Sequence, residues 1–249
     1  MTDPPAAPVF SIAGRIVLVT GAGRGIGRAL ATGLGRLGAR VHGMDVAFAE
    51  RASGFEAIHC DVGDEDASAR ALREIVSTHG RLDGLVNNAG ISLPPGDAYG
   101  RAGFERTLGI NTLAPLRLSW TAAELMKRHA SGSIVNVTSL GAHLGFPDNP
   151  AYQASKAALL QVTRAMAVDY GRFGIRVNSL CPGYVKTAMT RQSWEDESLR
   201  LARSQRMILP RWAEPEDLVG PCAFLLSDAA GYITGIDLPV DGGWRARGI

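Results

Sequence analysis

The sequence of 249 residues has little cysteine, and its 3 thiols are isolated from one another. They lie far apart among apolar residues, which excludes a disulfide-rich secreted scaffold and a CxxC-type metal cluster. Buried free thiols suit a reducing compartment, so this pattern predicts a cytoplasmic location. The three positions are Cys60, Cys181 and Cys222.

Long apolar runs and a strong net charge are also absent. No apolar run approaches the roughly 18 residues that a membrane-spanning helix requires, so we expect no membrane partner. The 26 basic and 24 acidic residues leave a formal charge of +2, which supplies no concentrated field for nucleic acid. The 5 histidines include no close pair at metal-ligand spacing, so we expect no metal site.

What is present is the composition of a folded globular protein. Hydrophobic residues make up 46% and charged residues 20% of the chain, which is too apolar for a disordered protein. The start, MTDPPAAPVF, lacks the basic and apolar regions of a signal peptide. We therefore expect a flexible tail over residues 1–10 and a single domain over residues 11–249.

Short apolar strands alternate with helical patterns along this domain. The first strand, within residues 15–20, stops at glycines and is followed by a helical pattern. This alternation predicts an α/β fold, a doubly wound parallel sheet with helices on both faces. An irregular insertion is expected over residues 188–212. Further strands are expected within residues 40–45, 56–60, 82–90, 133–139 and 175–181, and further helices within residues 65–80, 103–129 and 152–172.

The motif TGAGRGIG, residues 20–27, follows the first strand and opens the first helix. Its spacing is T-G-x-x-x-G-x-G, since Ile26 stands where a G-x-G-x-x-G motif would have its third glycine. Glycines let the backbone approach a pyrophosphate, and the helix dipole attracts it. A simple tight turn is the alternative.

Asp45 ends the second expected strand, 18 residues after Gly27. A carboxylate at this distance accepts hydrogen bonds from an adenosine ribose and repels a 2′-phosphate, which favours NAD. Arg24 would attract a phosphate, so NADP remains possible. An aspartate that merely starts a loop is the alternative.

The stretch AYQASKAALL places Tyr152 and Lys156 four positions apart, on one face of a helix. On spacing alone, an amphipathic helix with a solvated polar edge is the simpler interpretation. The catalytic alternative is that the ammonium makes the phenol a usable base. At roughly 4 to 5 Å and an effective dielectric near 20, it would lower the tyrosine pKa by about 2 to 3 units.

Together these motifs resemble the short-chain dehydrogenase/reductase family, and the resemblance covers essentially the whole chain after the tail. Ser139 precedes Tyr152 by 13 residues, as the catalytic serine of that family precedes its tyrosine. The resemblance implies a Rossmann-like fold. The matching segments are TGAGRGIG, CDV at 60–62, NNAG at 87–90, Asn111, Ser139, YQASK at 152–156, PG at 182–183 and the C-terminal FLLSDAAGYITGIDLPVDGG.

The resemblance implies a cofactor site along the carboxyl ends of the strands. Asp61 and Val62 would flank the adenine, whereas Val185 and Thr187 would meet the nicotinamide carboxamide. The other implied contacts are Gly21, Arg24, Gly25, Ile26, Gly27, Asp45, Asn88, Ala89, Gly90, Tyr152, Lys156, Pro182 and Gly183.

The resemblance also implies four catalytic residues. Tyr152 would exchange a proton with the substrate, while Lys156 would lower the pKa of Tyr152 and hold the nicotinamide ribose. Ser139 would orient the reacting oxygen, and Asn111 would hold a water that relays protons to Lys156. The expected activity is NAD-dependent hydride transfer to or from a secondary alcohol or ketone, namely a sugar, polyol or sugar acid.

Two alternatives to this activity remain open. An NADPH-dependent 3-oxoacyl-thioester reductase would use the same catalytic groups, and a non-catalytic dinucleotide-binding scaffold would share the fold. The resemblance further suggests a homotetramer, in which the helices near 103–129 and 152–172 pack against their symmetry mates.

The insertion is expected to form a lid over the substrate. Arg191, Trp194 and His143 are the candidate substrate contacts beside Ser139 and Tyr152. Their alternatives are a solvated helix, plain packing and an ordinary surface or core histidine. Four arginines of the insertion could hold an anion, although Asp196 and Arg200 have the spacing of a surface ion pair. These arginines are Arg191, Arg200, Arg203 and Arg206, and Trp194, Met207 and Trp212 would supply the apolar underside of the lid.

Overall fold

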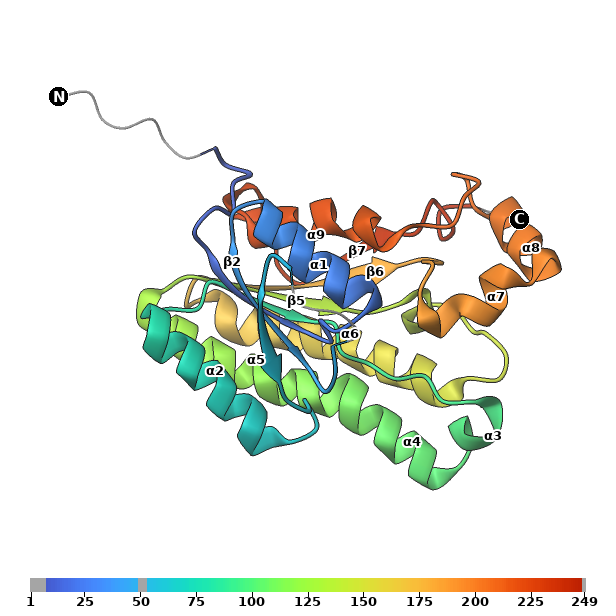
Figure 1. Cartoon of the computed structure of the whole chain (residues 1–249), viewed down its shortest axis with the longest axis horizontal. Helices are drawn as coiled ribbons and strands as arrows, with labels where there is room; N and C mark the ends of the chain where they lie inside the picture. The colour runs from blue at the N-terminus through green and yellow to red at the C-terminus, as the bar shows by residue number, and fades with distance from the viewer. Residues whose placement is uncertain (1–7, 49–52, 248–249) are drawn as a thin grey trace.

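Seven parallel strands form one sheet in the computed structural model, which describes residues 8–48 and 53–247 (Figure 1). The sheet confirms the predicted α/β fold, and residues 1–7 of the expected tail lie outside the described residues. In spatial order the strands are β3 (Glu56–His59), β2 (Arg40–Asp45), β1 (Ile16–Thr20), β4 (Gly84–Asn87), β5 (Gly132–Val137), β6 (Ile175–Pro182) and β7 (Asp237–Val240).

Strand β1 shows why helices cover both faces of the sheet. Val17 and Val19 belong to one hydrophobic core and Ile16 and Leu18 to the other, because successive side chains of a strand point to opposite faces. A continuously apolar strand therefore needs cover on both sides. One face packs against α1 (Gly25–Arg36) and α9 (Val219–Leu226), and the other against α2 (Glu65–His79), α5 (Ala114–Met126) and α6 (Pro150–Gly171) (Figure 1).

The single helix expected over residues 103–129 is interrupted. After the short α3 (Pro95–Ala98), α4 (Arg101–Leu108) runs into a π-helical segment, Gly109–Leu113, before α5 begins. Such segments are rare and are frequently found at functional sites. This one carries Asn111, whose side chain is fully buried.

The insertion at 188–212 is more regular than expected, since it contains α7 (Arg191–Glu195) and α8 (Glu197–Arg206). Asp196 caps α8 by accepting hydrogen bonds from the Leu199 N–H at 3.0 Å and the Ser198 hydroxyl at 2.6 Å. The spacing of Asp196 and Arg200 suggested an ion pair between them. The Arg200 guanidinium instead lies 3.9 Å from the carboxylate of Glu197.

His42 on β2 and His79 at the end of α2 lie in contact, although 37 residues separate them. Their Nε2 atoms are 2.9 Å apart, so one ring donates a hydrogen bond to the other. Burial lowers the pKa of His42, against the opposing effect of the Glu56 carboxylate 3.5 Å from its Nδ1. Sequence spacing could not reveal this pair.

We expect His42 to lower the stability of the fold as the pH falls. Because the pKa of His42 lies below its ordinary value of about 6.5, the unfolded chain binds a proton that the folded chain does not. The contribution is present above about pH 6.5 and is lost as the pH falls through the folded-state pKa. The free energy of unfolding, measured with urea between about pH 7.5 and about pH 5, should therefore fall more steeply with decreasing pH for wild type than for His42→Phe. Parallel curves would contradict this assignment.

Candidate active site

The predicted site residues gather at one edge of the sheet because the strands are parallel. β1, β4 and β5 are neighbours and end at Thr20, Asn87 and Val137. The glycine motif, the NNAG segment and Ser139 therefore follow adjacent strand ends. In doubly wound sheets this edge is where ligands bind.

Close backbone packing explains the spacing of the glycine motif. Gly21 and Gly25 have φ values of +69° and +55°, which favour glycine. A Cβ on Gly27 would lie 2.0 Å from the Gly21 carbonyl oxygen and 2.3 Å from Asn88 Nδ2. Ile26 packs against the core beneath α1. The glycines thus allow the turn to fold tightly as well as to approach a ligand.

The N-terminus of α1 fits the pyrophosphate of a dinucleotide. Arg24 occupies the N-cap position and makes no capping hydrogen bond with its side chain. By contrast, Asp64 caps α2 and Asp196 caps α8 through their carboxylates. No acidic side chain caps α1 or lies in its first turn, so its first N–H groups stay available for a phosphate.

The NNAG segment is fixed to this turn by hydrogen bonds. The Thr20 hydroxyl accepts from the backbone N–H groups of Asn88 and Ala89, each at 3.1 Å. The Asn88 amide donates to the carbonyls of Thr20 at 3.0 Å and Gly21 at 3.2 Å. Two segments 68 residues apart thus form one surface at the sheet edge.

Asp45 is directed toward the same turn. Its carboxylate accepts hydrogen bonds from the N–H groups of Gly23 at 2.8 Å and Ala47 at 3.3 Å. Asp45, the residue predicted to bind the adenosine ribose, therefore lies beside the glycine motif.

The remaining predicted cofactor residues lie in loops after β3 and β6. Asp61 accepts a hydrogen bond from Gly63 at 2.8 Å, and Val62 packs at the margin of the second core. Pro182 ends β6, and backbone bonds shape the segment beyond it. These bonds join Gly183 N to Val240 O at 3.0 Å, Lys186 N to Ala213 O at 2.9 Å and Thr187 N to Thr190 Oγ1 at 3.0 Å, and Val185 pairs with Ala213.

The Asn111 amide joins the loop after β4 to α6. Its Oδ1 accepts from the Ile91 N–H at 2.8 Å, and its Nδ2 donates to the Ile91 carbonyl at 2.9 Å and to Ser155 Oγ at 3.0 Å. A Cβ on Gly90 would lie 3.2 Å from Asn111 Oδ1 and 3.6 Å from Lys156 Nζ. The two predicted catalytic groups thus approach the same point.

Tyr152 and Lys156 lie on one side of α6, as their spacing predicts. Lys156 Nζ is 5.8 Å from the centroid of the Tyr152 ring, and it donates a 2.7 Å hydrogen bond to the Val137 carbonyl. Ser139 forms a side-chain hydrogen bond with Tyr152, and its Oγ accepts from the Gly141 N–H at 3.2 Å. Ser139, Tyr152 and Lys156 are therefore brought together.

Burial dominates the acidity of this pair. It raises the pKa of Tyr152 above the ordinary value, although the hydrogen bond with Ser139 lowers it. It also lowers the pKa of Lys156 to about 8. The expected lowering of the Tyr152 pKa by Lys156 is not found within the chain itself, because burial is the largest effect and raises this pKa, while the ammonium donates its hydrogen bond to the Val137 carbonyl.

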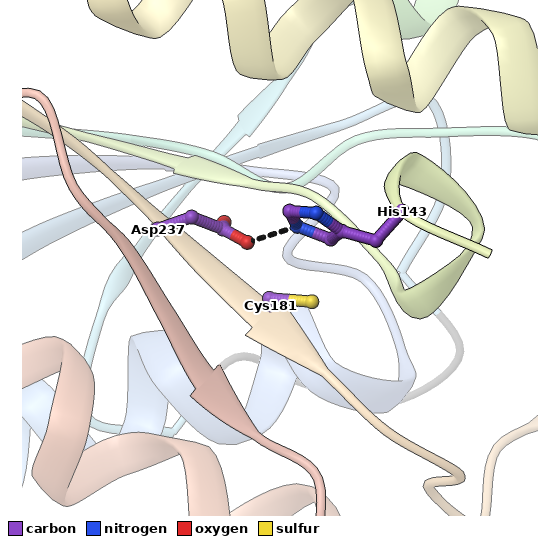
Figure 2. Close-up of side chains that lie close together, drawn as sticks. All are labelled: His143, Cys181 and Asp237. Carbon is purple, nitrogen blue, oxygen red and sulfur yellow. Dashed lines mark hydrogen bonds and ion pairs between the residues drawn. The ribbon is translucent and has the colours of Figure 1, made fainter. Parts of the chain in front are cut away.

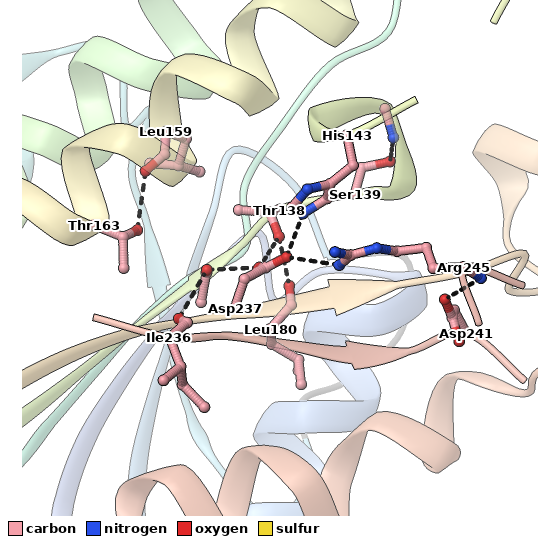
Figure 3. Close-up of polar contacts among 12 residues, drawn as sticks. Thr138, Ser139, His143, Leu159, Thr163, Leu180, Ile236, Asp237, Asp241 and Arg245 are labelled. Atoms are coloured by element: carbon pink, nitrogen blue, oxygen red, sulfur yellow. Dashed lines mark hydrogen bonds and ion pairs between the residues drawn. The ribbon is translucent and has the colours of Figure 1, made fainter. Parts of the chain in front are cut away.

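His143 belongs to a buried polar network around Asp237 on β7 (Figure 3). Its Nε2 lies 2.6 Å from an Asp237 oxygen, and Arg245 Nη1 lies 3.3 Å from the same oxygen. The other oxygen accepts from the hydroxyls of Ser179 at 2.6 Å and Thr138 at 2.8 Å. Burial opposes ionisation of Asp237, but these donors outweigh it and lower its pKa. The network fixes the His143 ring close to the Ser139 loop.

Cys181 lies beside this network, and one ligand atom each of His143, Cys181 and Asp237 falls within 4.8 Å of the others (Figure 2). The sequence does not predict this grouping. Both Asp237 oxygens already accept hydrogen bonds, and Arg245 adds a positive charge. Burial also raises the pKa of Cys181 to about 12, which keeps the thiol protonated. These properties favour a hydrogen-bond network over a metal site.

The insertion packs its apolar residues into a group that we call the tryptophan cluster. Trp194, Met207 and Trp212 meet Leu140, which directly follows Ser139. Arg191 does not join them, since it is exposed and lies 3.9 Å from Glu195. The cluster comprises Leu140, Leu144, Phe146, Cys181, Tyr184, Trp194, Met207, Trp212 and Trp244.

A cavity of about 700 Å³ lies beside α8. Arg200 and Ser204 of α8 line it together with Lys186 and Trp212. None of the four predicted catalytic residues lines this cavity, so it does not coincide with the candidate active site.

Known proteins resemble the chain over nearly its full length. A family model described as Enoyl-(Acyl carrier protein) reductase matches residues 21–245. The 2-dehydro-3-deoxy-D-gluconate 5-dehydrogenase of Pseudoalteromonas atlantica is 35% identical, over 96% of this chain and 98% of that protein. Human L-xylulose reductase is 37% identical, over 94% and 98%. A solved gluconate 5-dehydrogenase from Burkholderia cenocepacia, in complex with NADP and tartrate, has a TM-score of 0.90 and 31% identity, over 96% and 98%.

The fold, the glycine turn and these relatives define an oxidoreductase that uses a nicotinamide dinucleotide. The chain belongs to the short-chain dehydrogenase/reductase family, as its motifs predict.

Proposed function

We propose that the enzyme transfers hydride between a nicotinamide cofactor and a secondary alcohol or ketone of a sugar, polyol or sugar acid. The observation that carries this proposal is the convergence of Ser139, Tyr152 and Lys156, with Lys156 next to Gly90 of the NNAG segment. The relatives support the substrate class, because their names specify gluconate derivatives and L-xylulose.

Each catalytic side chain has a role in this proposal. Tyr152 takes the proton of the substrate hydroxyl in oxidation and returns it in reduction. Ser139 orients the reacting oxygen, and Lys156 holds the nicotinamide ribose. A bound oxidised nicotinamide would accept the hydride and add positive charge near Tyr152. Because burial raises the pKa of Tyr152, the phenol depends on that added charge and not on Lys156 alone.

Asn111 is proposed to support a proton relay. Its Oδ1 and Lys156 Nζ both approach the space beside Gly90, where a water could accept hydrogen bonds from the ammonium. The bonds of Asn111 to Ile91 and Ser155 would hold that position steady.

A screen of sugars, polyols and sugar acids, followed by the absorbance of NADH or NADPH, tests the proposal. We expect turnover with members of these classes. Turnover only with thioester ketones would overturn it.

The rival activity, an NADPH-dependent 3-oxoacyl-thioester reductase, draws support from the acyl-carrier description of the matching family model. Assaying an acetoacetyl thioester with both cofactors beside the sugar screen separates the two activities. A non-catalytic scaffold predicts dinucleotide binding without any turnover.

We propose NAD as the preferred cofactor, on the basis of Asp45. Its carboxylate lies beside the glycine turn and would repel a 2′-phosphate. Three solved relatives bind NADP, which supports the opposite preference, and Arg24 next to the turn could serve a phosphate. Asp45 is thus the residue of this chain that supports NAD.

We expect Asp45→Asn to shift the ratio of kcat/KM for NADP over that for NAD upward by about tenfold, since about 1.4 kcal/mol of repulsion is removed. Steady-state kinetics with both cofactors measure the ratio in wild type and variant. A wild-type enzyme with higher kcat/KM for NADP would refute the preference for NAD.

We also propose a cytoplasmic homotetramer. Leu113 and Trp120 around α5 and Val168 on α6 expose 44%, 58% and 81% of their surface, which favours coverage by another copy. The free thiols support a reducing location, and no helix in residues 8–48 or 53–247 is long and apolar enough to cross a membrane. A monomer in sedimentation velocity would contradict the tetramer.

A further inference from the structure

Three buried hydrogen-bond donors of the tryptophan cluster and α8 have no acceptor among the described residues. They are the indole nitrogens Nε1 of Trp194 and Trp244 and the Nη1 of Arg203. Trp244 is 5% exposed, so its N–H cannot be satisfied by bulk solvent. Buried polar groups are nearly always hydrogen-bonded, which makes three donors without an acceptor in one region an unusual arrangement.

Two of these donors, on Arg203 and Trp244, lie at one group of aromatic rings, and Trp194 packs against the same cluster. The Arg203 guanidinium carbon lies 4.7 Å from the centroid of the Tyr184 ring, and the Tyr184 and Trp244 centroids are 4.8 Å apart. Arg206 lies 4.9 Å from the centroid of the Trp244 ring on the same side of the insertion. Stacking and a side-chain hydrogen bond with Tyr184 hold the Arg203 guanidinium in place, while its Nη1 is left without an acceptor.

Arg203 and Arg206 also differ from the neighbouring arginines, which form ion pairs with carboxylates. Arg191 and Arg200 lie 3.9 Å from glutamates, and Arg211 lies 2.7 Å from Asp217. Within residues 8–48 and 53–247, neither Arg203 nor Arg206 forms an ion pair with a carboxylate. Their positive charge is therefore unbalanced on the side of α8 that packs against the tryptophan cluster.

The cluster connects these donors to the reacting groups. It contains Leu140, which directly follows Ser139, and Cys181 on β6, which lies beside the His143–Asp237 network. A substrate that reaches Tyr152 would thus have the insertion on one side.

We infer that Arg203, with the indole N–H groups of Trp244 and Trp194, binds the carboxylate of a sugar-acid substrate. This rests on the proposed function and narrows its substrate class. All three groups are donors, one is a fixed cation, and the rings around them exclude water, which together suit an anionic oxygen acceptor. A neutral polyol would gain less, because its hydroxyls would leave the charge unbalanced.

The test compares D-gluconate with D-glucitol, which differ by a carboxylate in place of a terminal CH₂OH. In Arg203→Met we expect the KM for D-gluconate to rise about tenfold or more, with the KM for D-glucitol and for cofactor within about twofold. Trp244→Phe should raise the D-gluconate KM by a smaller factor, since it removes one N–H and keeps the ring. Arg101→Met, a matched change at an arginine of α4 whose side chain is 90% exposed, should leave both values unchanged.

Arg203→Lys keeps the charge and should retain part of the D-gluconate affinity, which decides the matter if Arg203→Met does not fold. Tryptophan fluorescence of the protein with cofactor, titrated with each compound, reports binding without turnover. Equal effects of Arg203→Met on both compounds, or better binding of D-glucitol by wild type, would overturn the inference while leaving the proposed function intact. Absence of turnover together with selective binding of D-gluconate would instead refute the proposed function and support the carboxylate site.

Discussion

Replacing Tyr152 with phenylalanine is expected to lower kcat by about a thousandfold, with the KM for the cofactor within about twofold of wild type. The substitution removes only the hydroxyl that Ser139 contacts and that exchanges the proton. The ring, and its packing near Lys156, stays in place. Steady-state kinetics with the best substrate of the screen measure both constants.

Tyr232→Phe is the matched control. Because the Tyr232 side chain is fully exposed, this variant should keep the kcat of wild type. Turnover of Tyr152→Phe close to that of wild type would remove the proposed mechanism. A large loss in both variants would point to an effect unrelated to proton transfer.

Replacing Lys156 with methionine is expected to lower kcat/KM at least about a hundredfold and yet to stabilise the fold. Burial lowers the pKa of Lys156 from its ordinary value of about 10.4 to about 8, and each unit corresponds to about 1.4 kcal/mol. The buried charge therefore costs about 3 kcal/mol at neutral pH. Loss of the bond to the Val137 carbonyl offsets about 1 kcal/mol of the gain, which leaves about 2 kcal/mol.

The pH dependence distinguishes this explanation from a general packing effect. Because the folded-state pKa is lowered, wild type gains stability as the pH rises from about 8 to about 10.4, where the unfolded chain still holds the proton. The methionine variant lacks this gain. Urea unfolding of both proteins should show the stability difference shrinking over that window. A difference that stays constant would contradict the buried charge as its cause.

The sequence predicted those parts of the fold that local patterns determine. The expected strand within residues 15–20 has a continuous apolar run over residues 16–19 because both of its faces are buried, and Gly80 ends α2 in the left-handed conformation that glycine favours. The candidate site follows from the same logic, since parallel strands must end at one edge. Tyr152 and Lys156 needed only the helical period to be placed together.

What the sequence could not show depends on contacts between distant segments. His143 and Asp237 are 94 residues apart, and no local pattern links them. Strand β7 is short, contains proline and lies at the sheet edge, so its pattern is weak. The helices of the insertion depend on a cap at Asp196 that also fits an ion-pair spacing.

Helix α6 spans 22 residues, about 33 Å, yet its two reacting side chains occupy only its first two turns. The opposite end lies deep in the second core, where Met166, Ala167 and Tyr170 are buried. Tyr152 and Lys156 thus lie at one end of a long helix whose other end is buried in the core. Because this buried end is fixed by packing, we expect the helix to hold the two side chains in a constant position relative to the sheet.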